Sequence, residues 1–110
     1  SVFTHLPPSV LTDCLAAIRQ SISPNGLLVA TILPMEFWLT PSHATVADPA
    51  TFIAQHRRDG FAFNPSSTSH YGELTISPAA LARLAAGWKL VGTDWNHADP
   101  FQHIVLLQPA

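Results

Sequence analysis

The stretch SVFTHLPPSVLTDCLAAIRQSISPNGLLVATIL, residues 1–33, decides the fold that we expect for this chain. Between residues 8 and 22 its apolar side chains recur every three to four positions, which predicts a helix with one buried face. Pro8 suits the first helical position, and the SPNG turn at residues 23–26 ends the helix because proline cannot continue it. The apolar run at residues 27–33 then predicts a strand covered on both faces.

A strand covered on both faces usually has a parallel neighbour, which it reaches through a right-handed crossover helix. Residues 1–33 therefore have the pattern of the helix and second strand of a βαβ unit, and the first strand is expected upstream of Ser1. The strand at residues 27–33 should then have one paired edge and one bare edge. A bare apolar edge is a site for pairing with another chain.

The C-terminal third of the chain predicts one more helix and a hairpin. A Ser-Pro pair caps a helix over residues 78–86, and a glycine follows it. Two β-rich runs, residues 88–96 and 101–108, are separated by four residues, a length typical of a hairpin. They should pair antiparallel.

The middle of the chain, residues 34–70, is expected to be a variable lid or insertion. It begins with a loop whose apolar residues, Trp38 among them, either pack on the core or line a pocket for a substrate. A short helix should run from Pro49 to Gly60. A brief strand at residues 61–63 and a polar, mobile loop at residues 64–69 should follow.

Several of these stretches resemble class I S-adenosylmethionine-dependent methyltransferases. SVFTHLPP at residues 1–8, the helix after it, and SPNG with its apolar strand at residues 23–33 resemble the region that follows the fourth strand of that family. Tyr71-Gly72, the helix at residues 78–86, and the runs GWKLVGTDWNH and FQHIVLLQP look like the family's last helix and closing antiparallel hairpin.

The resemblance implies an α/β fold, the C-terminal part of a Rossmann-like methyltransferase sheet. The elements in order are a helix, a parallel strand, an inserted helix, a second helix and the closing hairpin. The chain is expected to be a single partial domain, divided into residues 1–33, 34–70 and 71–110. The family's last strand inserts between the two before it, which predicts the spatial order 27–33, 101–108, 88–96.

The resemblance also implies roles for individual residues. Ser1, Val2 and Phe3 would line the pocket for the cofactor S-adenosylmethionine, and His5 would be catalytic, facing the transferred methyl group or its acceptor. Tyr71, together with the tryptophan of the lid, would bind the substrate. The residues alone leave alternatives: His5 caps or packs beside the helix start, Phe3 belongs to the core, and the Tyr71 ring closes the edge of the core.

One departure from the family limits the predicted function. The five glycines are scattered without G-x-G spacing, so the glycine-rich turn that holds the cofactor is not in this chain. We therefore expect the C-terminal portion of a methyltransferase that acts on a small molecule, inactive alone, with its N-terminal half or a second copy as partner. The alternative is a non-enzymatic module that self-associates through its exposed strand edge.

Composition favours one small domain with some apolar surface against a partner, since 47% of the 110 residues are hydrophobic and 11% charged. The net charge of −2, with no basic cluster beyond Arg57-Arg58, argues against nucleic-acid binding. The apolar runs are too short to span a membrane, and we expect a cytoplasmic protein. Six histidines without metal-site spacing and a single cysteine argue against a metal site and an internal disulfide.

Overall fold

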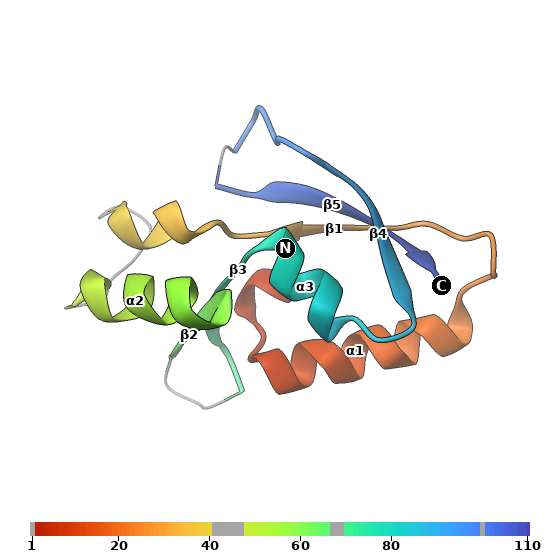
Figure 1. The fold of residues 1–110 in the computed structure, drawn as a ribbon, viewed down its shortest axis with the longest axis horizontal. Helices are drawn as coiled ribbons and strands as arrows, with labels where there is room; N and C mark the ends of the chain where they lie inside the picture. Colours follow the sequence, from red (N-terminus) through yellow and green to blue (C-terminus); the bar gives the residue numbers. More distant parts are fainter. Residues whose placement is uncertain (1, 41–47, 67–69, 100) are drawn as a thin grey trace.

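Figure 1 shows the fold in a computed structural model that describes residues 2–40, 48–66, 70–99 and 101–110. In chain order the elements are η1 (Phe3–His5), α1 (Pro8–Ser21), β1 (Leu28–Ile32), η2 (Met35–Leu39), α2 (Pro49–Asp59), β2 (Phe61–Pro65), β3 (Gly72–Ile76), α3 (Pro78–Leu84), β4 (Trp88–Asp94) and β5 (His103–Pro109), where η marks a 3₁₀ helix. Helices and strands in this described part confirm the α/β class. Ser1 and part of the loop predicted at residues 64–69 lie outside it.

The main sheet has three strands in the order β1–β5–β4, so the last strand of the chain lies between the other two. Both pairs are antiparallel, with Ala30 opposite Val105 in one and Leu90 opposite Leu107 in the other. An extra residue, Val91, shifts the register of β4, as a β-bulge does. The strand order predicted from the sequence is confirmed.

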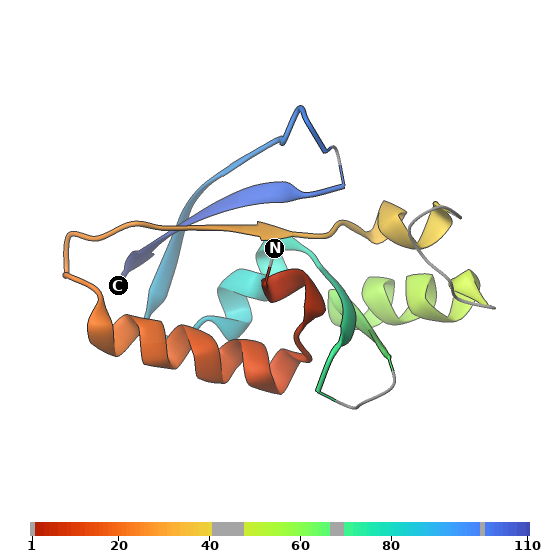
Figure 2. The same ribbon diagram turned by 180° about the vertical axis from the view of Figure 1, so that it is seen from behind.

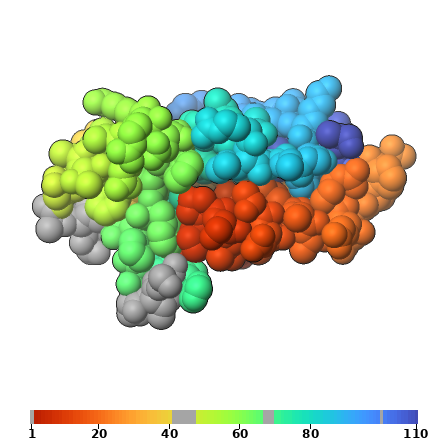
Figure 3. Space-filling view, turned by 60° about the horizontal axis from the view of Figure 1, so that its bottom comes forward, coloured from red at the N-terminus to blue at the C-terminus, as the bar shows by residue number. Residues whose placement is uncertain are grey.

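Both α1 and α3 pack on the same face of this sheet (Figures 1 and 3). The main core lies between them and the sheet, where Leu11 of α1, Leu81 of α3 and Leu107 of β5 are fully buried. On the opposite face, Val29 is 57% exposed and Val91 is 42% exposed. The prediction that the first strand is covered on both faces is therefore wrong for the described residues, because both helices lie on one side of it.

β1 is one of the two outer strands of the sheet, which Figure 2 shows from behind. Beyond its end, Leu33 forms an isolated parallel bridge with Thr75, and the N–H of Ile76 donates to the carbonyl of Leu33 over 3.0 Å. Along Leu28–Ile32 the free edge has no strand partner within residues 2–40, 48–66, 70–99 and 101–110. Among the described residues, no two strands pair in parallel, so the expected parallel, Rossmann-like sheet is not seen there.

The inserted segment builds a second, smaller cluster around Trp38, Phe37 and Ala62. Helix α2 begins at Pro49 as predicted and ends at Gly60, which has φ +82°. A methyl group at Gly60 would lie 2.6 Å from the Cβ of Ala80, so helix α3 also requires glycine there. The strand predicted at residues 61–63 is present as β2 and pairs antiparallel with β3.

Three hydrogen bonds tie α1 to the C-terminal part of the chain. The indole N–H of Trp88 donates to the carbonyl of Leu15 over 3.0 Å. Arg19 donates to the carbonyl of Gly87 over 3.0 Å and to that of Ala110 over 3.4 Å. These contacts hold α1 beneath the sheet. None of the helices described is long and apolar enough to cross a membrane.

Candidate functional site

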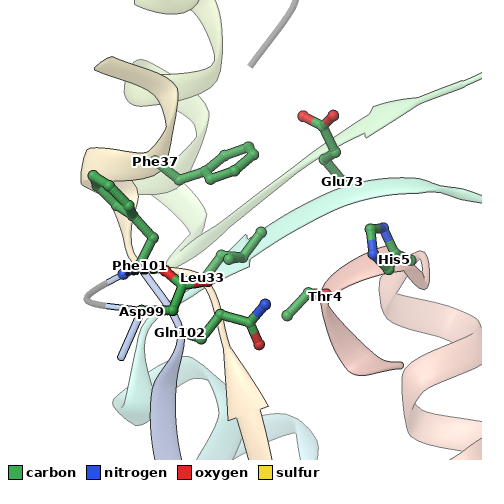
Figure 4. A pocket seen from close by; sticks show the side chains of 8 residues that line it. All are labelled: Thr4, His5, Leu33, Phe37, Glu73, Asp99, Phe101 and Gln102. Atoms are coloured by element: carbon green, nitrogen blue, oxygen red, sulfur yellow. Dashed lines mark hydrogen bonds between the residues drawn. The ribbon is translucent and has the colours of Figure 1, made fainter. Parts of the chain in front are cut away.

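A pocket of about 170 Å³ opens at the carboxyl end of β1 (Figure 4). The pocket is lined by Thr4, His5, Leu33, Phe37, Glu73, Asp99, Phe101 and Gln102. These residues come from η1, the end of β1, η2, β3 and the β4–β5 connection, so the pocket depends on the whole fold.

His5 is held in one orientation by a hydrogen bond to β3. Its Nδ1 lies 2.9 Å from the carbonyl oxygen of Gly72, which only accepts, so Nδ1 carries the proton. In the neutral imidazole, Nε2 is then the acceptor. The ring is thus fixed as a group that takes a proton, or accepts a hydrogen bond, through Nε2.

Tyr71 stacks on His5, with the ring centroids 4.9 Å apart and the planes inclined by 10°. The Tyr71 side chain is 53% exposed, so it covers the outer side of the imidazole and remains in contact with solvent. His5 and Tyr71, singled out separately from the sequence, are therefore neighbours. A stacked ring restricts the imidazole further. Tyr71 itself lines a neighbouring hollow of about 400 Å³, which shares His5 and Glu73 with the pocket.

Glu73 contributes a carboxylate from β3. Its Oε2 atom is buried and has no hydrogen-bond partner. Burial raises the pKa of Glu73, and the charge of the nearby His5 opposes that rise. An unpartnered carboxylate oxygen is costly to bury, so a hydrogen-bond donor that reached this atom would stabilise it.

The remaining walls combine aromatic rings with polar groups. Figure 4 shows the rings of Phe37 and Phe101 on one side of the pocket, with His5 on the other and Gln102 between them. One oxygen of Asp99 accepts the backbone N–H of Phe101 over 3.1 Å, which orders the connection between β4 and β5. The lining therefore has two carboxylates and no lysine or arginine.

In comparisons with protein-family models, curated proteins and solved structures, this chain has no match.

Trp38, predicted to bind substrate, is in the core and not among the residues that line this pocket. It is 1% exposed and stacks on Phe52 with centroids 4.7 Å apart. Its indole N–H donates to the Thr75 hydroxyl over 2.7 Å, and that hydroxyl also lies 2.9 Å from Nδ1 of His56. Of the two alternatives from the sequence, packing on the core is the one that this geometry supports.

The residues predicted to bind the cofactor lie beside the free edge of β1. Val2 is 69% exposed and Phe3 is 9% exposed, and both line a groove of about 200 Å³ with Leu28, Val29, Ala30 and Thr31. Ser1 is outside the described residues. The groove is apolar and contains no carboxylate for ribose hydroxyls, so these residues do not by themselves fit S-adenosylmethionine. Their role in cofactor binding stays a prediction.

Sequence reasoning missed Glu73 and Asp99. Glu73 had one usable signal, because it is the single charged residue of the strand GELTI at residues 72–76. Asp99 sits in a turn, where aspartate usually serves the backbone, and it does so here. Only the fold places its side chain in a pocket with a residue from β3.

Proposed function

We propose that this chain is the C-terminal portion of an S-adenosylmethionine-dependent methyltransferase domain that acts on a small molecule. The observation that supports this is the strand order β1–β5–β4, with the last strand inserted and both α1 and α3 on one face. The order matches the expectation from the family resemblance. The family resemblance predicts this order, and local sequence patterns do not imply it.

Under this proposal the Rossmann-like, parallel part of the sheet lies beyond the free edge of β1. Its strands would pair with that edge, its helices would cover the exposed Val29 face, and it would bring most of the cofactor site. The described residues would supply the acceptor side, where His5 accepts a proton through Nε2 and Tyr71 stacks on its ring. A cytoplasmic location belongs to the same proposal and rests on composition alone.

Two binding measurements test this proposal. The chain alone should not bind S-adenosylhomocysteine at micromolar concentration in a calorimetric titration, because no glycine-rich turn is present. The gene upstream of Ser1 should encode a glycine-rich strand-turn-helix, and the protein translated with that region should bind the same ligand. Micromolar binding by the chain alone, or none by the extended protein, would contradict the proposal.

A second candidate function is a non-enzymatic module that self-associates, and the free edge of β1 favours it. This edge carries the exposed Leu27 and Val29 and no charged side chain. Two copies related by a two-fold axis through Ala30 would join their sheets into one six-stranded sheet.

Sedimentation of matched variants tests the second candidate. Val29→Lys puts a charge at the free edge of β1 and should give a monomer. Val91→Lys makes the same change on the other outer strand, where the bulge already disturbs pairing, and should leave the dimer intact. A wild-type protein that stays monomeric at high concentration would exclude this function.

A further inference from the structure

We infer that the pocket at the carboxyl end of β1 binds its small molecule through a protonated amine. As a statement about the methyl acceptor, this inference rests on the proposed function. As a statement about binding, it rests on the pocket alone.

The charge of the pocket selects against anions. Glu73 and Asp99 reach it from different elements, and neither a lysine nor an arginine is among its lining residues. A ligand carboxylate or phosphate would meet two like charges, and His5 is the one basic side chain in the lining, so its binding is unfavourable in a partly desolvated pocket. A ligand cation would be attracted by both carboxylates.

The unpartnered oxygen of Glu73 needs a hydrogen-bond donor. An ammonium group carries up to three N–H donors, and its hydrogen bonds to a carboxylate are among the strongest in proteins. One N–H would satisfy Oε2 of Glu73, and another can reach toward Nε2 of His5, which is the accepting nitrogen of that ring in its neutral form. An alcohol offers a single donor and no charge.

The aromatic walls suit the rest of such a ligand. Phe37 and Phe101 stand across the pocket from His5 (Figure 4), where they would contact either the apolar part of the ligand or its charge. The volume of about 170 Å³ is several times the share of one liquid water molecule, about 30 Å³. A small aryl or alkyl amine therefore fits.

The test compares three probes of nearly equal size: benzylamine, benzyl alcohol and benzoate. Each is titrated into the isotopically labelled chain, and the amide signals of Tyr71, Gly72 and Glu73 are followed by NMR. We expect benzylamine to bind about tenfold or more tightly than benzyl alcohol, because a charge-assisted hydrogen bond replaces a neutral one. Benzoate should bind most weakly.

Variants of the two carboxylates test which of them is responsible for the preference for benzylamine. Glu73→Gln keeps the shape of the side chain and should reduce benzylamine binding to the level of benzyl alcohol. Asp99→Asn keeps the acceptor for the N–H of Phe101 and should cause a smaller loss. Asp13→Asn, the same change at an exposed position on α1, is the matched control and should have no effect.

Three outcomes would overturn the inference: equal binding of the probes, preferred binding of benzoate, or unchanged benzylamine binding by a folded Glu73→Gln variant. The absence of shifts at residues 71–73 would also do so. All of these titrations are done without the cofactor. Their failure therefore leaves the binding of S-adenosylhomocysteine by the extended protein untouched, and failure of that measurement leaves the amine site standing.

Discussion

Replacing Thr75 with valine should destabilise the protein far more than its small change in shape suggests. Thr75 is fully buried in β3, and its hydroxyl accepts the indole N–H of Trp38 over 2.7 Å and lies 2.9 Å from Nδ1 of His56. Valine has the same size without the hydroxyl. It therefore leaves the indole N–H of Trp38 and Nδ1 of His56 without this partner, in residues that are 1% and 8% exposed.

The expected cost follows from those two groups. Each buried polar group that loses its partner costs about 1–3 kcal/mol, so two should cost about 2–4 kcal/mol after some relaxation. The matched control is Thr75→Ser, which keeps the hydroxyl and removes one buried methyl group at a cost of about 1 kcal/mol. The larger loss is a substantial part of the about 5–15 kcal/mol that stabilises a typical domain.

Urea unfolding followed by far-ultraviolet circular dichroism measures both variants against the wild type. Tryptophan fluorescence is unsuitable as the sole signal because the chain has three tryptophans. A Thr75→Val variant that is no less stable than Thr75→Ser would refute the reasoning. It would mean that the Trp38 and His56 nitrogens find other partners or water when the hydroxyl is gone.

Three further predictions concern pH and backbone strain. Burial lowers the pKa of His56, so the unfolded chain binds a proton more readily and the free energy of unfolding should fall as the pH drops below about 6.5. Urea unfolding at pH values of about 7.5 and 5.5 measures this fall, which should be smaller in His56→Gln. Equal falls in the two proteins would contradict the prediction. Burial raises the pKa of Glu73 despite the opposing charge of His5, so the ionised carboxylate destabilises the folded protein above the pKa of the unfolded chain, near 4.5. Glu73→Gln should therefore raise the urea midpoint at neutral pH, and this gain should fade toward pH 4. A lower midpoint at neutral pH would be evidence against the prediction. Gly60→Ala should lose about 1–2 kcal/mol from the left-handed backbone alone, and more from the contact with Ala80, so an unchanged melting temperature would contradict the geometry of that turn.

The sequence predicts best those helices whose first or last residue is a proline, a glycine or a capping serine. Helix α1 begins at Pro8, α2 begins at Pro49 and ends at Gly60, and the Ser77 hydroxyl accepts the N–H of Ala80 at the start of α3. Each signal acts within a few residues of the chain. That is why it could be interpreted without knowing the fold.

Strand β3 was missed because its pattern is set by tertiary packing. Its residues 73–76 alternate between polar and apolar, but Leu74, Thr75 and Ile76 are buried in succession, so burial does not follow that alternation. The same limit applies to Trp38, where an aromatic run fits a pocket wall or a core equally well. Only the buried hydroxyl of Thr75, distant in the sequence, makes the core the better place for that indole.

The candidate site was predicted in its parts and not as an arrangement. His5 was chosen for its chemistry and Tyr71 for its place in the family resemblance, but 66 positions separate them. Their stacking needs β3 to lie beside η1. Glu73 and Asp99 meet in one pocket for the same kind of reason, so the acidic character of the site was not visible in the linear order. The methyltransferase resemblance itself stays a prediction.

The clamp between α1 and the end of the chain has a consequence for synthesis on the ribosome. The carbonyl of Leu15 gains its hydrogen bond only after Trp88 has been synthesised. Arg19 likewise gains its hydrogen bonds only after Gly87 and Ala110 have been synthesised. Contacts so distant in sequence must close a long loop first, which slows folding. Helix α1 should thus remain undocked after it leaves the exit tunnel, with its apolar face open to chaperones, until β5 has emerged.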